Sequence, residues 1–370
     1  MKQILLGPPS LAQDEIKAVS RVIKSGQLSL GEETAKFEQE MAQWVGTKYA
    51  VAVSSGTTGL HLAVIAAGIK QGDEVITAPF SFVASTNCFL YEKAVPKFVD
   101  IDQVTFNIDV NKIEAAITDK TRAIVGVDIF GYPAEWGKIS AIAKKYNLAV
   151  IEDAAEALGA KYKGKKLGSL GQPTIFAFYP NKQMTTGEGG MVVTNDKKTY
   201  QLIKGLANQG RGPQMQWLKH EYLGYNYRMT ELSAAIGRAQ LKKLDWFLKS
   251  RQKVAGWYNQ RLKNIPAIQL IKTDDKEHER SWFVYVVRLD KKINRDKIIN
   301  KLIRAGIPSK AYLPSIHLQP YMKPYGFKPG DFPVSEAVSN STLSLPFYTE
   351  MKQSTVDYVC EKLIKTLKSS

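Results

Sequence analysis

Residues 176–194 read FAFYPNKQMTTGEGGMVVT. The apolar run at residues 174–179 predicts a buried strand that the Pro-Asn pair at 180–181 ends, and residues 191–194 predict a second strand. Lys182 lies on the turn between them. Burial frees the amine of a lysine to form a Schiff base with an aldehyde cofactor. A surface lysine in a glycine-rich hairpin is the alternative, and this segment alone favours neither.

The rest of the chain predicts an α/β fold around this stretch. Strand patterns at 49–53, 74–78, 94–99, 123–127 and 148–151 alternate with helical patterns. Such alternation is typical of a mainly parallel sheet covered by helices on both faces. Towards the N-terminus, Ile16, Val19, Val22 and Ile23 predict a helix that begins at a Ser10 capping box and buries this stripe.

The length of 370 residues fits two domains. We expect a large domain at residues 10–250 and a smaller α+β domain at residues 251–370, with residues 1–9 packed on the smaller one. A single long helix is predicted from Thr230 to beyond Leu248.

Composition narrows the function classes. Hydrophobic content of 44% and charged content of 23% are ordinary for a globular protein, whereas the formal net charge of +16 is high. Because Lys and Arg are scattered and no nucleic-acid motif occurs, we prefer attraction of small phosphorylated ligands to nucleic-acid binding. Lysine-rich solvated surfaces are the simpler alternative.

Cysteine and histidine usage points to a reducing compartment without a metal site. The two cysteines, Cys88 and Cys360, have no metal-ligand spacing, and the four histidines are dispersed. No signal peptide or membrane span is evident. We therefore expect a cytoplasmic protein with no membrane or nucleic-acid partner.

Three further positions are candidates for one phosphorylated ligand. Ser55, Gly56 and Thr57 form a small-residue turn between a strand and a helix predicted at 60–67, where backbone N–H groups face an anion. Asp153 ends a strand, where ligands of open α/β sheets collect, and Phe82 follows another strand end. The alternative for residues 55–57 is a plain strand-to-helix turn. Asp153 would otherwise be an N-cap or part of a salt bridge, and Phe82 a core aromatic.

Seven ordered motifs together resemble the DegT/DnrJ/EryC1/StrS family of aminotransferases that use pyridoxal 5′-phosphate (PLP) and act on nucleotide sugars. They extend over nearly the whole chain: VSSGTT at 53–58, SFVAS at 81–85, EDAAEA at 152–157, FYPNK at 178–182, GEGG at 187–190, GYNYRM at 224–229 and PSIHLQP at 314–320. The resemblance implies fold-type I, with a large PLP domain and a small C-terminal domain.

The resemblance also implies roles for single residues. Lys182 would hold PLP covalently and later move a proton, Asp153 would pair with the ring nitrogen, and Phe82 would stack on the ring. Ser55, Gly56 and Thr57 would hold the phosphate, together with Asn226 from the partner subunit of a homodimer. Glu156 stands where relatives often have Gln, and a carboxyl group donates a hydrogen bond there only when protonated.

One position departs from the family pattern. Many relatives have Ser at the position of Ala177, where the hydroxyl contacts the phosphate. Phosphate binding in this chain would therefore depend on Ser55, Thr57, Asn226 or water.

The resemblance implies a two-stage transamination, with L-glutamate as donor and the keto sugar of a nucleoside diphosphate as acceptor. Arg228, His317 and the 27–30 loop, with Leu28, are candidates for the sugar-nucleotide pocket. A structural salt bridge and a satisfied loop histidine are the alternatives for Arg228 and His317. A PLP-dependent sugar dehydratase is a second hypothesis, which Lys182 disfavours because known dehydratases of this kind lose the lysine. A non-catalytic regulator that retains the fold is a third.

Overall fold

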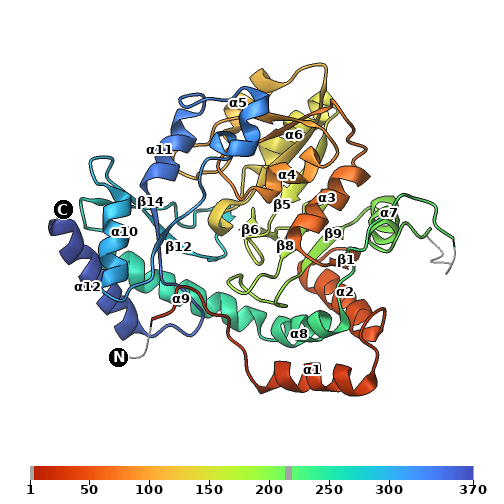
Figure 1. Ribbon diagram of the computed structural model, residues 1–370, viewed down its shortest axis with the longest axis horizontal. Coiled ribbons are helices and arrows are strands. Elements are labelled where there is room, and N and C mark those ends of the chain that lie inside the picture. Colours follow the sequence, from red (N-terminus) through yellow and green to blue (C-terminus); the bar gives the residue numbers. More distant parts are fainter. Residues whose placement is uncertain (1–3, 213–218, 370) are drawn as a thin grey trace.

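The computed structural model describes residues 4–212 and 219–369 (Figure 1). The helices are α1 Gln13–Ser25, α2 Glu32–Val45, α3 Gly56–Ala66, α4 Ala84–Leu90, α5 Val110–Ala116, α6 Trp136–Tyr146, α7 Lys197–Ala207, α8 Glu231–Leu241, α9 Leu244–Leu262, α10 Arg295–Arg304, α11 Pro333–Ser341 and α12 Gln353–Lys368. The strands are β1 Tyr49–Val53, β2 Glu74–Thr77, β3 Val95–Phe98, β4 Thr121–Val127, β5 Ala149–Asp153, β6 Lys161–Tyr162, β7 Lys165–Lys166, β8 Thr174–Ala177, β9 Gly190–Thr194, β10 Ile268–Leu270, β11 His278–Glu279, β12 Tyr285–Leu289, β13 Lys310–Ala311 and β14 Thr342–Leu345.

A 7-stranded sheet in the order β1-β9-β8-β5-β4-β2-β3 forms the centre of the molecule. The pairs from β8 through β5, β4 and β2 to β3 are parallel, and β9 is antiparallel to both β8 and β1. Alternate side chains of β8 enter different cores, with Ile175 packed among residues of α3, α4 and α7 and Phe176 among those of α2, α6 and α8. The predicted mainly parallel sheet between two helical layers is therefore confirmed.

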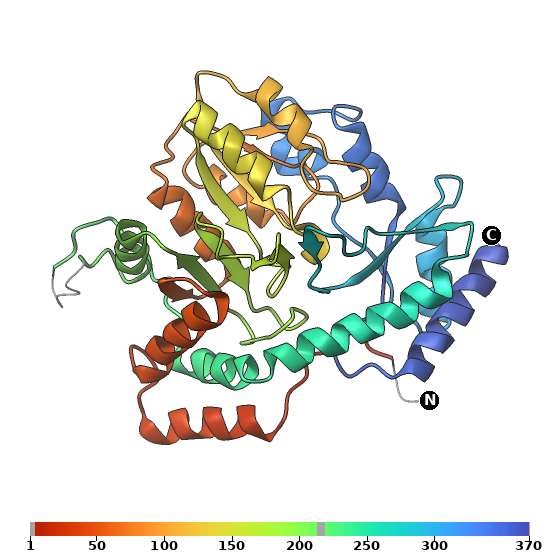
Figure 2. The same ribbon diagram turned by 180° about the vertical axis from the view of Figure 1, so that it is seen from behind.

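The C-terminal third builds a second, antiparallel sheet in the order β10-β12-β14-β13, which carries α10 and α12 (Figure 2). Helix α9 runs from beneath the large sheet to this second sheet in both views. The predicted domain boundary at residues 250–251 falls inside α9, so one continuous helix connects the two parts. Near the N-terminus, the Leu6 carbonyl accepts a hydrogen bond from the Phe347 N–H at 2.8 Å. Residues 1–3 lie outside the described part of the chain.

Helix α1 packs differently from the prediction. It begins at Gln13, after Ala12, whose N–H donates to Glu15 Oε2 at 2.8 Å, and no Ser10 cap forms. Its buried residues are Glu15, Ala18 and Val22, and Ile16 is 59% exposed. Of the predicted stripe, Val22 is buried, whereas the predicted burial of Ile16 and Ile23 is wrong because both are 59% exposed. The face towards α8 instead carries Glu15, whose carboxylate accepts from Gln240 Nε2 and pairs with Lys243.

Two more helices differ from their predicted bounds. The helix expected from Thr230 to beyond Leu248 is two helices, α8 and α9, separated at Lys242–Lys243. The helix expected from Leu60 begins earlier, at Gly56, because the Ser55 side chain caps it. The glycine-threonine turn is thus the first turn of α3, and its backbone N–H groups are those of a helix N-terminus.

Candidate active site

Lys182 lies in the turn after β8, with its side chain 13% exposed. Its Nζ is 3.8 Å from Glu156 Oε1 and 3.9 Å from the centre of the Phe283 ring. The turn is held by buried Arg251 of α9, whose Nη2 donates to the Lys182 carbonyl at 3.1 Å. Burial lowers the pKa of Lys182, although the nearby carboxylates of Glu156 and Asp153 act in the opposite direction. A buried amine that loses its proton readily is suited to covalent chemistry.

Asp153 is the last residue of β5, and its carboxylate is fixed from two sides. The Ser85 hydroxyl donates to Asp153 Oδ2 at 2.6 Å, and the Ala155 N–H donates to Oδ1 at 3.1 Å. Burial raises the pKa of Asp153, which these hydrogen bonds and the charge of Lys182 partly offset. A second cation beside this carboxylate would stabilise its charged form. A protonated pyridine nitrogen is such a cation, so the residues present fit a PLP ring.

Glu156 stands between Lys182 and the backbone. Its Oε2 accepts a hydrogen bond from the Phe130 N–H at 2.9 Å, while Oε1 faces Lys182. Burial raises the pKa of Glu156, and the charge of Lys182 lowers it. A raised pKa favours the protonated carboxyl, which can donate a hydrogen bond as well as accept one.

The predicted phosphate site is a tight backbone cup at the start of α3. Ser55 Oγ accepts from the Thr58 N–H at 3.1 Å, so this side chain caps the helix. A Cβ added at Gly56 would lie 2.8 Å from the Ala177 Cβ, and one at Gly190 would lie 2.6 Å from the Ser55 carbonyl. Helix α3 therefore begins in direct contact with β8 and β9. Its free N–H groups fit an anion, and Ala177 contributes a methyl group and no hydroxyl donor beside them.

Three of the residues predicted for stacking, phosphate binding and substrate binding are exposed. Phe82 is 61% exposed just before α4, and Leu28 and Asn226 are also exposed. Arg228 Nη1 donates a hydrogen bond to Asn208 Oδ1 at 3.0 Å. The Arg228 side chain and Leu30 both line one cavity of about 190 Å³. The structure thus brings Arg228 and the 27–30 loop together.

His317 lies apart from these residues. It is fully buried, with Nε2 3.1 Å from Glu336 Oε1, and contacts the rings of Phe327 and Phe332. Its role in substrate binding stays a prediction, as do the roles of the other residues above.

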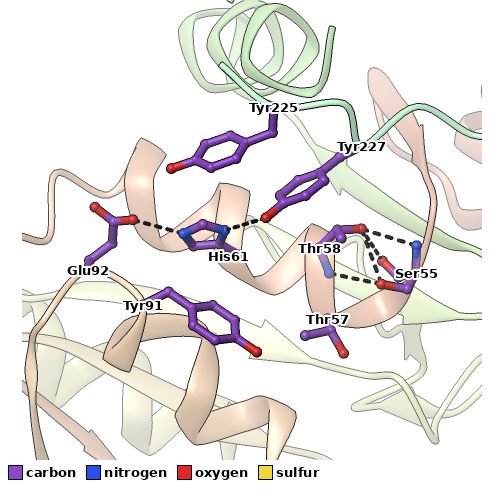
Figure 3. Close-up of a pocket in the computed structure, with 8 residues that line it drawn as sticks. All are labelled: Ser55, Thr57, Thr58, His61, Tyr91, Glu92, Tyr225 and Tyr227. Atoms are coloured by element: carbon purple, nitrogen blue, oxygen red, sulfur yellow. Dashed lines mark hydrogen bonds and ion pairs between the residues drawn. The ribbon is translucent and has the colours of Figure 1, made fainter. Parts of the chain in front are cut away.

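The sequence patterns missed a second cluster next to the cup. A cavity of about 380 Å³ lies between this cluster and the cup (Figure 3). The cluster contributes His61, Tyr91, Glu92, Tyr225 and Tyr227 to its lining, and the cup contributes Ser55, Thr57 and Thr58. The one available signal was the spacing of His61, four residues after Thr57, which places both on one face of a helix. Phe283 and Arg251, which contact Lys182 and its turn, were also missed.

Within residues 4–212 and 219–369, no helix is long and apolar enough to cross a membrane. The same ranges contain no group of three or more His, Cys, Asp or Glu residues arranged to hold a metal ion.

Comparisons with known proteins identify the family and the fold of the chain. The sequence model of the DegT/DnrJ/EryC1/StrS aminotransferase family matches residues 9–364. GDP-perosamine synthase from Caulobacter vibrioides is 39% identical over 92% of this chain and 91% of its own. DesV from S. venezuelae, solved with a ketimine intermediate, superposes with a TM-score of 0.90 at 32% identity, over 95% of this chain and 93% of its own. The PLP-form of Spr1654 from Streptococcus pneumoniae superposes with a TM-score of 0.93 at 26% identity, over 99% of both chains.

Proposed function

The chain belongs to the DegT/DnrJ/EryC1/StrS aminotransferase family and has the fold-type I architecture, and from this premise we propose which reaction it carries out. It transfers an amino group, with L-glutamate as donor and PLP as cofactor, to the keto sugar of a nucleoside-diphosphate sugar. The observation that carries the proposal is the meeting of Lys182, Glu156 and Asp153 at one buried place beside the α3 cup. Lys182 packs on Phe283 and pairs with Glu156, and a buried amine held in this way is suited to form a Schiff base with an aldehyde cofactor.

Bound PLP would supply an electron sink for the charge that forms when the carbon bearing the amine loses a proton. Lys182 would hold the cofactor, and its amine, once released, is the base that removes this proton and returns it. Burial lowers the pKa of that amine and so favours the neutral form that a base needs. Asp153 would hold the ring nitrogen, and its bond from Ser85 keeps the carboxylate in place. The α3 N–H groups would hold the phosphate.

The acceptor assignment rests on charge and on the relatives. A formal net charge of +16 attracts a diphosphate, and GDP-perosamine synthase, a relative at 39% identity, is named for a GDP-linked product. Arg228 and the loop around Leu28 would contact the nucleotide sugar. His317 would act at this site only if the segment that buries it moved.

The active form in this proposal is a homodimer in which Asn226 reaches the phosphate of the partner subunit. Helix α1 and the loop that follows it support such a subunit interface, because they expose the apolar side chains of Ile16, Ile23, Leu28 and Leu30. A PLP-dependent dehydratase is disfavoured because the reactive lysine is present. A regulator without catalysis is disfavoured because it has no use for a buried Lys182–Glu156–Asp153 cluster.

Two half-reactions measured by absorbance test this function. L-glutamate alone should bleach the band of the bound cofactor, and one member of a panel of nucleotide-linked keto sugars should restore it. Recovery with simple 2-oxo acids but with no nucleotide sugar would refute the sugar assignment while leaving the transaminase assignment intact. A wild-type protein that binds no PLP would refute both.

A further inference from the structure

A buried histidine connects two segments next to the cup. His61 of α3 is 4% exposed, and its Nε2 lies 2.8 Å from Glu92 Oε1 while its Nδ1 lies 3.3 Å from the Tyr227 hydroxyl (Figure 3). An ionised carboxylate can only accept a hydrogen bond, so Nε2 carries the proton in a neutral ring. Nδ1 then accepts from the Tyr227 O–H. The three side chains form a chain of hydrogen bonds that ends on one tyrosine.

Tyr227 in turn holds the backbone that leads into the cup. Its carbonyl accepts from the Ser54 N–H at 2.8 Å, and its N–H donates to the Ala207 carbonyl at 3.0 Å. The next residue, Arg228, forms a β-bridge with Val53 at the end of β1. Backbone hydrogen bonds and this isolated bridge therefore hold residues 227–228 against the turn that begins the phosphate cup.

The same segment faces two ways. The rings of Tyr225 and Tyr227 stack with their centres 4.8 Å apart and both face His61. In an extended segment successive side chains point to opposite sides, so Asn226, which is exposed, points away from His61. The hydrogen bond to Tyr227 thus fixes which side chains of this segment face inward.

We propose that Glu92, His61 and Tyr227 act as positioning residues that hold the start of the cup in its phosphate-binding shape. This proposal rests on the proposed use of PLP. The cup has no hydroxyl at Ala177, and Ser55 already caps α3, so in this proposal the phosphate depends on backbone N–H groups together with the Thr57 hydroxyl and Asn226 of the partner subunit. Hydrogen bonds to fixed N–H groups depend on where the backbone lies, which makes the Ser54–Tyr227 contact important for them.

Comparing PLP with pyridoxal, which lacks the phosphate, tests this role. We would remove the cofactor from the full-length protein and titrate each compound back, following its absorbance. Tyr227→Phe keeps the ring stack and deletes only the hydroxyl. The Kd for PLP should rise about fivefold, the size of one hydrogen bond, whereas the Kd for pyridoxal should stay within twofold of wild type.

Matched variants define the contributions. Tyr225→Phe deletes a neighbouring hydroxyl that makes no hydrogen bond to another described residue, and its Kd for PLP should not change. His61→Asn should resemble Tyr227→Phe, and the two changes combined should cost less than their sum because they break one chain of hydrogen bonds.

The outcomes separate the possibilities. An equal loss of affinity for PLP and pyridoxal in Tyr227→Phe would mean a general structural role and would overturn the proposal. Unchanged PLP affinity in both Tyr227→Phe and His61→Asn would overturn it as well, with the proposed function untouched. If wild-type protein binds no PLP, the proposed function fails and the positioning role fails with it.

Discussion

The floor of the candidate site and its rim are built in opposite ways. On the floor, Asp153 is 5% exposed and Glu156 is 7% exposed, and each is fixed by hydrogen bonds from other elements. On the rim, Phe82 is 61% exposed and Leu28 is 48% exposed. The groups proposed for the proton chemistry are therefore held in fixed positions. The groups that would choose the substrate remain open to another molecule.

The largest expected effect is at the centre of the floor. Lys182→Ala should lower the rate of amino transfer from L-glutamate by at least about 10³-fold, because it removes both the covalent attachment and the base. Stopped-flow absorbance of the glutamate half-reaction measures it. Lys70→Ala, an exposed lysine, is the control and should retain the wild-type rate. A Lys182→Ala protein with more than a tenth of that rate would contradict the floor assignment.

Asp153→Asn should come next, with a loss of roughly 10²-fold in the same half-reaction, since a neutral amide lacks the negative charge that stabilises a protonated ring nitrogen. Ser85→Ala removes one hydrogen bond to the carboxylate and should lose about tenfold or less. A larger loss in Ser85→Ala than in Asp153→Asn would show that the hydroxyl, and not the carboxylate, faces the ring.

Phe82→Leu tests the rim and should have a smaller effect. Loss of aromatic stacking should raise the Kd for PLP by about tenfold, and the Tm without cofactor should change little because the ring is exposed. Absorbance titration and thermal denaturation measure the two quantities. A large drop in Tm at unchanged Kd would mean that the Phe82 side chain packs in the interior in solution. That result would contradict its assignment to the exposed rim.

The smallest expected effect is on the free energy of unfolding and comes from Glu152, the neighbour of Asp153 in β5. Burial raises the pKa of Glu152 from 4.5 to about 7. The stabilisation from its protonated form is therefore present below pH 4.5 and lost as the pH rises through 7. Glu152→Gln keeps an acceptor for Thr174 and Gln172 and does not titrate. Its free energy of unfolding relative to wild type should increase from pH 5 to pH 8 in urea denaturation, and an unchanged difference would contradict the shift.

Much of the floor was predictable because its signals are local. Lys182 follows a strand at a glycine-rich turn, and Asp153 ends the neighbouring strand, so sheet topology alone brings them to one edge. The pattern could not show that Phe283 covers Lys182, since that contact spans about a hundred residues of chain.

The failures share a physical cause, which is choice of partner. The apolar stripe on α1 predicts that Ile16, Val22 and Ile23 are buried together. The face that is buried carries Val22 and Glu15 instead, and Glu15 pairs with Lys243. The hydrogen bond from Tyr227 to His61 joins residues 166 positions apart, and no local sequence pattern at either residue predicts this contact. Helix bounds near caps shifted for a related reason, as the Ser55 side chain extends α3 by a full turn.

The most direct test is to locate the covalent bond between protein and cofactor. Wild-type protein would be mixed with PLP, reduced with borohydride, digested, and mapped by mass spectrometry. We predict that the cofactor mass is found on the peptide containing Lys182 and that it disappears in Lys182→Ala. A cofactor mass on another lysine, or on the same peptide in Lys182→Ala, would contradict the assignment of Lys182 as the residue that holds PLP.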